Sequence, residues 1–379
     1  MSGRIYLDYN ATSVVRPEAE AAAVAALRLG GNASSIHAAG RAARAMVEEA
    51  REAVASLAGA RPQDVVFTSG GSEANTLAIL SAVQAGSRRL IIGATEHASV
   101  LDTAATSDAA MELWPVDASG LADLGWLAER LKGWRAEDGR PFVAVMAANN
   151  ETGVIQPVTE IAALVHEADG WLHVDAVQAT GKIPIDNLPA DTMAVSAHKI
   201  GGPQGSGALI VACDAELTRR AFGGGQERGR RGGTENLSGI SGFGAAARTV
   251  LASGPLDHAA WRDAAAERLK GEAGAVVLGE GAPRLSNTLC FATPGFASDL
   301  QVIALDLAGV MVSAGAACSS GKVKSSHVVE AMGRGDLGAC SLRASGGWAT
   351  TEADWARFVE AWLEAHARQA SRTRPLVEA

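Results

Sequence analysis

The chain has 379 residues, 47% hydrophobic and 20% charged, a composition typical of a soluble globular protein with roughly two to three structural units. Its formal net charge of -9 argues against nucleic acid or an anionic membrane as the main partner. No apolar run approaches the ~20 residues that span a bilayer, and the amino terminus lacks a signal-peptide core, so we expect a cytoplasmic protein.

Apolar runs alternate with helical patterns over the first two thirds of the chain. Residues 37–57 carry apolar residues at every third or fourth position, which predicts a helix with a charged face that includes Arg51 and a buried face of Ala39, Ala42, Met46, Ala50, Val54 and Leu57. Short apolar runs predict strands at residues 65–68, 89–93, 142–148, 171–174, 193–197 and 208–212. This alternation implies an α/β fold with a mainly parallel sheet covered on both faces, and we expect residues 14–253 to form this large domain.

The pattern changes after residue 253. Helices are predicted at residues 258–269, 298–307 and 352–365, and strands at residues 275–278 and 287–292. These shorter elements predict a smaller α+β domain at residues 254–379.

A lysine follows the strand predicted at residues 193–197. Lys199 stands between this strand and a glycine-rich run, which should hold it at a strand end that faces a cleft. Lysine has an ordinary pKa of about 10.4, but partial burial and nearby positive charge can lower the pKa enough for attack on a carbonyl. Lys199 is therefore a candidate Schiff-base residue, and the alternative is an exposed surface lysine.

An acid ends the strand predicted at residues 171–174. An aspartate such as Asp175 at a strand end can hold a pyridinium nitrogen protonated, and the amide of Gln178 follows three residues later. A helix N-cap or a buried ion pair is the alternative for Asp175.

The strand predicted at residues 65–68 runs through Gly71 and Ser72 into a helical pattern. Free backbone N–H groups and the helix dipole make such a turn an anion site, although an ordinary helix cap is the alternative. The spacing matches neither the dinucleotide fingerprint nor the P-loop. A phosphate cradle, an acid for a pyridine ring and a Schiff-base lysine together describe a pyridoxal-phosphate enzyme.

Several motifs in combination resemble those of the class V aminotransferase fold group, and within it the cysteine desulfurases of the NifS and IscS type. They lie at residues 6–12, 95–97, 149–153, 173–178 and 196–207, and the resemblance runs from about Ile5 to past Arg343. It implies the pyridoxal-phosphate transferase type I (aspartate aminotransferase-like) fold, with a seven-stranded-type sheet in the large domain. It also implies that the amino-terminal arm, residues 1–13, packs against the smaller domain.

The resemblance implies a role for individual residues of this chain. Lys199 would bind pyridoxal 5'-phosphate, Asp175 would protonate its ring nitrogen, and Gln178 would bind its phenolic oxygen. His97 would stack on the ring and help to move protons. The phosphate would be held by Gly71, Ser72, Ser196 and His198, and the substrate carboxylate by Asn150 and Arg343.

A glycine-rich, basic loop covers residues 223–236. From the residues alone it reads as a flexible surface loop or as a nucleic-acid contact. The resemblance assigns it instead to the interface of a homodimer, where Thr234 reaches the cofactor phosphate of the other subunit.

One cysteine differs from the other three in its surroundings. Cys318 lies among small residues, with glycines on both sides and lysines just beyond, and nearby positive charge favours a reactive thiolate over the alternative of a buried, inert thiol. We expect Cys213, Cys290 and Cys340 to be inert, and their spacing indicates neither zinc nor disulfides. The desulfurases carry their nucleophile in a Ser-Ser-Gly-Ser-Ala-Cys-like motif, whereas this chain has Ser-Ala-Gly-Ala-Ala-Cys.

We therefore predict a cysteine desulfurase, a sulfurtransferase that converts L-cysteine to L-alanine. Sulfur would pass to Cys318 as a persulfide and then to acceptor or scaffold proteins for iron-sulfur cluster or thio-cofactor biosynthesis. An aminotransferase or a selenocysteine lyase of the same family is the alternative enzyme. An inactive scaffold is the alternative that is not an enzyme, and intact Lys199, Asp175 and Cys318 argue against it.

Overall fold

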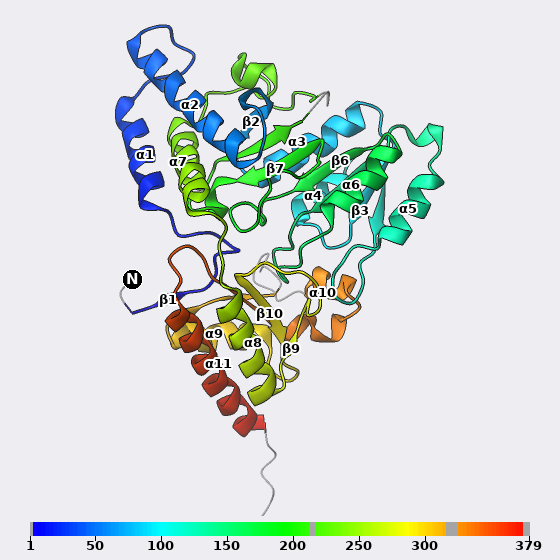
Figure 1. Ribbon diagram of the computed structural model, residues 1–379, viewed down its shortest axis with the longest axis vertical. Coiled ribbons are helices and arrows are strands. Elements are labelled where there is room, and N and C mark those ends of the chain that lie inside the picture. The colour runs from blue at the N-terminus through cyan, green and yellow to red at the C-terminus, as the bar shows by residue number, and fades with distance from the viewer. Residues whose placement is uncertain (1–2, 213–216, 316–324, 374–379) are drawn as a thin grey trace, which may run out of the picture.

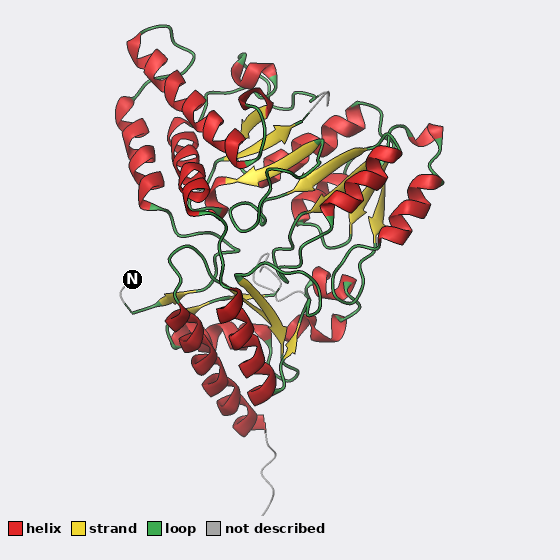
Figure 2. Cartoon of the chain, viewed as in Figure 1, coloured by secondary structure: helices red, strands yellow, loops and turns green. Residues whose placement is uncertain are grey.

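The computed structural model describes residues 3–212, 217–315 and 325–373 (Figure 1). Two sheets organise these residues, one of seven strands and one of four, and helices cover both (Figure 2). No helix in these described ranges is both long and apolar enough to cross a membrane.

The larger sheet has the strand order β2-β8-β7-β6-β5-β3-β4. Strand β8 runs antiparallel to both of its neighbours, and every other adjacent pair is parallel. The strands are β2 Val65–Thr68, β3 Arg89–Gly93, β4 Ala110–Trp114, β5 Phe142–Met146, β6 Trp171–Asp175, β7 Thr192–Ser196 and β8 Gly207–Val211. The predicted α/β fold with a mainly parallel sheet is confirmed, and β4 is a strand that the sequence analysis does not predict.

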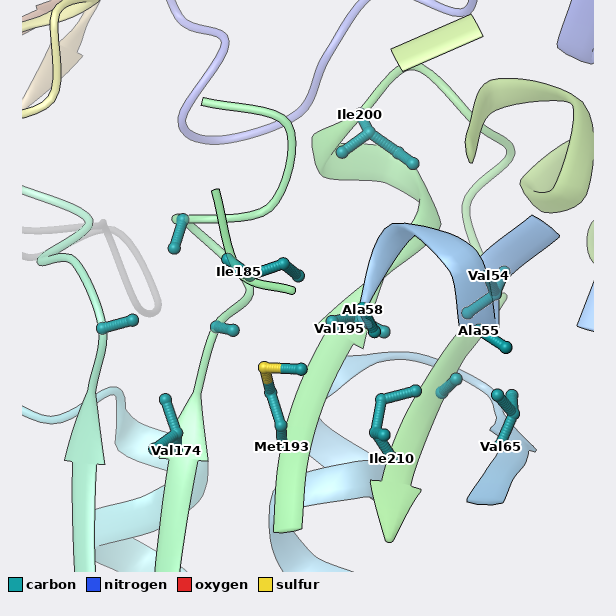
Figure 3. Packing of buried hydrophobic residues seen from close by; sticks show 14 of the residues in the cluster. Val54, Ala55, Ala58, Val65, Val174, Ile185, Met193, Val195, Ile200 and Ile210 are labelled. Atoms are coloured by element: carbon teal, nitrogen blue, oxygen red, sulfur yellow. The ribbon is translucent and has the colours of Figure 1, made fainter. Parts of the chain in front are cut away.

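Every residue of β5, β6, β7 and β8 is buried, because helices cover both faces of the sheet. On one face, apolar side chains of these strands pack against the end of α2 (Figure 3). The helices on this side are α1 Pro17–Leu29, α2 Ala38–Leu57, α5 Leu124–Lys132, α6 Val158–Glu167 and α7 Leu237–Ser253. The opposite face is covered by α3 Gly71–Gln84 and α4 Ala98–Ala105.

The buried face of α2 agrees with the predicted one at Ala50 and Val54 and differs from it in the first half of the helix. Ala42 is exposed and Ala43 is buried, and Arg51, predicted to be solvated, is also buried. The Arg51 guanidinium donates two hydrogen bonds to the Glu227 carboxylate, Nη1 to Oε2 at 2.8 Å and Nη2 to Oε1 at 2.9 Å. A charged residue can face the core here because a carboxylate meets it there.

The smaller sheet is antiparallel, with the order β12-β13-β10-β9. Its strands are β9 Val276–Val277, β10 Thr288–Ala292, β12 Ser313–Ala314 and β13 Ser341–Ser345. Aromatic rings of Phe291, Phe358 and Trp362 pack edge to face in its core. The surrounding helices are α8 Ala259–Ala273, α9 Ser298–Leu307, α10 His327–Ala331 and α11 Glu352–Thr373.

The amino-terminal arm lies beside this smaller sheet (Figure 1). Its strand β1 Ile5–Tyr6 pairs in parallel with β11 Val310–Met311. The division into domains at residues 14–253, and at residues 1–13 with 254–379, stays a prediction. Short 3-10 helices complete the fold, η1 Pro62–Asp64, η2 Ala136–Asp138, η3 Ala197–Lys199, η4 Gln226–Gly229 and η5 Gly335–Cys340.

Candidate active site

A cavity of about 730 Å³ opens at the carboxyl ends of β5, β6 and β7, where ligands bind in such sheets. Its wall also includes the amino-terminal arm, α9 and the smaller sheet. The predicted site residues that line it are Gly71, Ser72, His97, Asn150, Asp175, Gln178, Ser196, His198, Lys199 and Arg343. Thr234 is exposed and does not line it, and Cys318 lies outside the described residues.

The amino-terminal end of α3 forms one wall of the cavity. Its first N–H groups have no intrahelical partner, and the nearby Ser196 hydroxyl is buried without a hydrogen-bond partner among the described residues. A Cβ atom on Gly71 would lie 2.5 Å from Val177 Cγ2, so any larger residue here would have to displace the Val177 side chain. Oxygen atoms of a phosphate would satisfy the orphaned hydroxyl and the helix N–H groups together, so the wall fits this group.

A chain of buried polar groups holds Asp175. The Asn75 amide donates to Asp175 Oδ2 at 2.8 Å, and the backbone N–H of Val177 donates to Oδ1 at 2.9 Å. Behind them, His173 Nε2 lies 3.0 Å from Asn75 Oδ1. Burial lowers the pKa of His173 to about 3, so the neutral ring donates to Asn75 and turns the Asn75 amide nitrogen towards Asp175.

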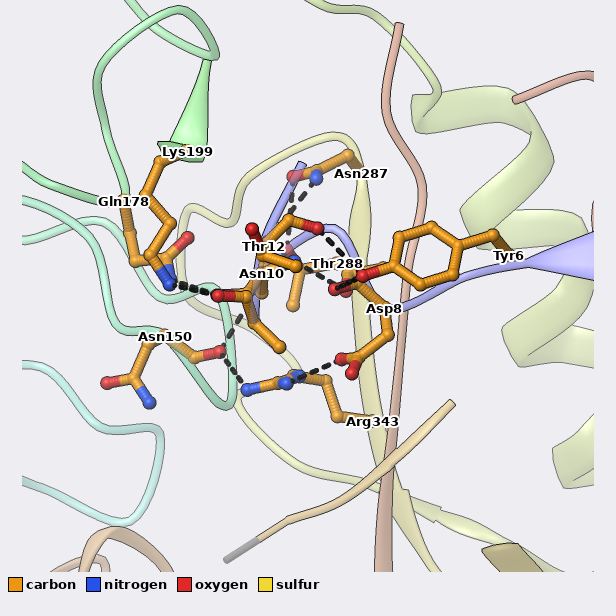
Figure 4. A network of polar contacts seen from close by, with 12 residues as sticks. Tyr6, Asp8, Asn10, Thr12, Asn150, Gln178, Lys199, Asn287, Thr288 and Arg343 are labelled. Carbon is orange, nitrogen blue, oxygen red and sulfur yellow. Dashed lines mark hydrogen bonds and ion pairs between the residues drawn. The ribbon is translucent and has the colours of Figure 1, made fainter. Parts of the chain in front are cut away.

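Lys199 lies in η3, directly after β7, and its amine contacts the amino-terminal arm (Figure 4). Nζ donates to the backbone oxygen of Asn10 at 2.5 Å and to that of Ala11 at 2.9 Å. Burial, and then the positive charge of Arg343, lower the pKa of Lys199 to about 8. The neutral, nucleophilic amine is therefore accessible much closer to neutral pH than in an ordinary lysine.

Arg343 lies on β13 and its guanidinium enters the cavity from the smaller sheet (Figure 4). Nη2 donates to Asp8 Oδ1 at 2.8 Å and Nη1 donates to the backbone oxygen of Asn150 at 3.0 Å. Nε is buried and has no partner among the described residues. Arg343 thus forms an ion pair with Asp8. Its Nε–H group still remains as a donor for the carboxylate of a ligand.

His97 is the N-cap of α4, and its ring faces the open cavity. Its Nδ1 accepts a hydrogen bond from the backbone N–H of Ser99 at 3.1 Å. The protein packed around the ring lowers the pKa of His97 by desolvation, which favours a neutral imidazole.

Two of the three cysteines expected to be inert lie in the described residues. Cys290 and Cys340 are both buried and free. Burial raises the pKa of Cys290 to about 12 and also raises the pKa of Cys340, so both thiols are held in their unreactive form. Cys213 lies outside the described residues.

Four residues that contact the lining of the cavity are not predicted as site residues from the sequence, namely Asp8, Asn75, His173 and Lys182. Asn75 lies one helical turn after Gly71, and that spacing is the only sequence signal for it. Asp8 lies in the amino-terminal motif quoted for the resemblance.

Comparison with known proteins identifies the family. The family model for aminotransferase class V matches residues 5–358, and the chain therefore belongs to this family. A cysteine desulfurase of Cereibacter sphaeroides is 41% identical over 343 residues, which cover 87% of each chain.

Solved structures show the same likeness. The NifS-like protein from Rickettsia africae ESF-5 superposes with a TM-score of 0.88 at 30% identity, over 96% of this chain and 99% of that one. SspA in complex with cysteine gives a TM-score of 0.77 at 29% identity, over 90% of this chain and 98% of that one. The resemblance to the cysteine desulfurases of the NifS and IscS type is confirmed.

Proposed function

We propose that the chain is a pyridoxal-phosphate-dependent cysteine desulfurase that converts L-cysteine to L-alanine and collects the sulfur on Cys318. The observation that carries this function is that three groups line one cavity. They are the Lys199 amine with its lowered pKa, the Asp175 carboxylate held by hydrogen bonds, and the Arg343 guanidinium, which can bind a carboxylate. The names of the relatives support the activity, and the neighbour described in complex with cysteine supports the substrate.

The residues present fit pyridoxal phosphate. Asp175 would face the ring nitrogen, Gln178 the phenolic oxygen and His97 the ring face. The phosphate would be held by Gly71, Ser72, Ser196 and His198, where Ser196 has an unsatisfied hydroxyl. When bound, the cofactor supplies an electron sink that makes the bonds at the substrate Cα labile.

Side chains of the protein carry out the individual steps of the reaction. Lys199 moves the Cα proton at Nζ, since its lowered pKa allows the amine to accept and return a proton. Arg343 and Asn150 orient the substrate carboxylate. Cys318 attacks the substrate sulfur as a thiolate, so a sulfur–sulfur bond forms and the carbon–sulfur bond breaks. The electron pair stays on carbon, which takes a proton to give the methyl group of alanine.

The proposal includes a homodimer in the cytoplasm. Thr234 is exposed and does not line the cavity of its own chain, which supports its assignment to the cofactor phosphate of the other subunit. The persulfide on Cys318 would pass its sulfur to an acceptor or an iron-sulfur scaffold protein.

The experiment is to measure alanine and sulfide released from L-cysteine in the presence of pyridoxal phosphate and a reductant. The parent protein should give both products in equal amounts, and Lys199→Ala and Cys318→Ala should give neither. A yellow parent protein that forms no alanine would keep the cofactor assignment and overturn the substrate. A Cys318→Ala variant with normal product formation from an amino acid and a keto acid would indicate an aminotransferase instead.

A further inference from the structure

A second lysine lies close to Lys199 and has no part in the reaction as described above. Lys182 is buried, and it donates to Gln178 Oε1 at 2.6 Å and to Asn10 Oδ1 at 2.8 Å. Burial lowers its pKa well below the ordinary value, and the positive charges of Lys199 and Arg343 lower it further. Burial of an amine near two positive charges destabilises the folded protein. We therefore expect its hydrogen bonds to serve a function.

Lys182 does not line the large cavity, whereas Gln178 does. It lines a separate cavity of about 30 Å³ on the other side of Lys199, together with Tyr9, Arg16 and Trp348. Lys182 therefore acts on the site through Gln178 and Asn10 and not by touching a ligand.

The contacts of Gln178 fix which way its side-chain amide points. Nε2 donates to the backbone oxygen of Asn10 at 2.8 Å, and Oε1 accepts from Lys182. A carbonyl oxygen only accepts, so the nitrogen must face Asn10, and the oxygen must face the amine. The amide nitrogen carries two protons, so a second proton remains for an acceptor in the cavity.

The same amine fixes the side-chain amide of Asn10. Its Nδ2 donates to the backbone oxygen of Asn150 at 3.2 Å and to Thr288 Oγ1 at 2.9 Å, which leaves Oδ1 for Lys182. A neutral amine and a charged ammonium both carry the two protons that these bonds need. The arrangement therefore holds in either protonation state of Lys182.

We propose that Lys182 is a positioning residue that helps to hold the Gln178 amide with one N–H group towards the cavity, so that Gln178 donates to the oxygen substituent on the pyridine ring. This inference rests on the proposed function, since the acceptor is a group of the cofactor. Without Lys182, the bond from Nε2 to the backbone oxygen of Asn10 is the one contact among the described residues that still orients the Gln178 amide. An amide that rotates would present its oxygen to the cofactor acceptor, which repels it.

The experiment is a double-mutant cycle read by cofactor binding and by the visible absorption of the bound cofactor. The proteins are the parent, Lys182→Met, Gln178→Leu and the double variant, each titrated with pyridoxal phosphate. We expect Lys182→Met to weaken binding about fivefold to tenfold, which corresponds to one lost hydrogen bond, and to shift the absorption band in the same direction as Gln178→Leu. In the Gln178→Leu background, Lys182→Met should leave the band in place and should weaken binding less than it does in the parent, because only its bond to Asn10 is then lost.

Thr180→Val is the matched control, because Thr180 is buried in the same turn and bonds only the backbone oxygen of Ala176 among the described side-chain contacts. It should lower the unfolding temperature and leave the absorption band in place. If Lys182→Met does not fold, Lys182→Leu, which also removes the donor, takes its place in the cycle.

Two results would overturn the inference. The first is that the effects of Lys182→Met and Gln178→Leu on cofactor binding are additive, and the second is that the absorption band of Lys182→Met is not shifted. A parent protein that takes up no pyridoxal phosphate would overturn the proposed function instead, so the two failures are distinguishable.

Discussion

Asp8 Oδ1 lies 2.8 Å from Arg343 Nη2, so the arginine proposed to bind the substrate carboxylate already pairs with a carboxylate of its own chain. A ligand carboxylate that approaches Arg343 meets the negative charge of Asp8. We predict that Asp8→Asn tightens the binding of L-alanine about tenfold, because repulsion at a partly exposed site is worth about 1 to 2 kcal/mol. Titration of the holoenzyme with L-alanine measures this.

The matched variant is Arg343→Leu, which should act in the opposite direction. Loss of a charged donor to the carboxylate should raise the KM for L-cysteine about 100-fold, with a smaller effect on kcat. Unchanged L-alanine binding in both variants would show that the substrate carboxylate lies elsewhere.

The lowered pKa of Lys199 predicts how cofactor uptake depends on pH. The pKa of about 8 lies below the ordinary 10.5, so the amine is protonated below pH 8 and nucleophilic above it. The rate at which apo-protein develops the visible band should therefore rise with pH through a midpoint near 8. Lys199→Ala should develop no such band, and a midpoint near the ordinary value would contradict the prediction.

The same shift has a consequence for stability. Between pH of about 8 and 10.5 the unfolded chain binds more protons at Lys199 than the folded chain does. The contribution of Lys199 to the free energy of unfolding therefore rises with pH across this window, and its burial is most unfavourable below pH 8.

Asn75 joins His173 to Asp175 by hydrogen bonds at both ends of its amide. In Asn75→Leu both neighbours lose a buried partner, so we expect pyridoxal-phosphate affinity to fall about tenfold. Asn75→Asp should be worse, since an acceptor-only side chain would then face the Asp175 carboxylate. Titration with the cofactor measures both, and an affinity equal to the parent's in both variants would remove Asn75 from the site.

The ion pair between Arg51 and Glu227 predicts a large stability effect far from the chemistry. Glu227→Gln removes the buried carboxylate that meets the Arg51 charge and leaves it only the exposed carboxylate of Glu48, which should cost about 3 kcal/mol in the free energy of unfolding. Urea unfolding measures this. Glu48→Gln is the control, because Glu48 also bonds Arg51 but its side chain is 40% exposed, and it should cost about 0.5 kcal/mol or less. Equal effects of the two variants would contradict the prediction.

The sequence predicts those elements whose burial is uniform. The strands at residues 65–68 and 89–93 agree with β2 and β3 to the residue, because each forms an unbroken buried or half-buried run. Strand β4 is not predicted because it is an edge strand in which Trp114 is buried and the other four residues, Glu112 among them, are exposed or half-buried. The buried face of α2 is only partly predicted, because alanine recurs on several sides of this helix and gives little contrast between its faces.

For the site, residues with a local sequence signal are predicted, whereas their partners from distant parts of the chain are not. Motifs at strand ends point to Lys199 and Asp175, because the fold brings the carboxyl ends of parallel strands to one edge. The partners of these residues are not predictable from local pattern. Asp8 is 335 positions from Arg343 along the chain, and only the tertiary structure shows that the two side chains meet.

The backbone oxygen of Asn10 accepts a hydrogen bond from the Lys199 amine, and Asn10 also donates hydrogen bonds to Thr288 and Ser345. Segments that are far apart along the chain therefore meet at the cavity. During synthesis on the ribosome the first of these segments appears long before the last. The amino-terminal arm can pair with β11 before this, but its contact with Ser345 must wait until β13 has been made. Capture of the proposed cofactor in its final setting would thus follow the synthesis of β13, and a chain stalled before residue 345 has the lysine but not the complete pocket around it.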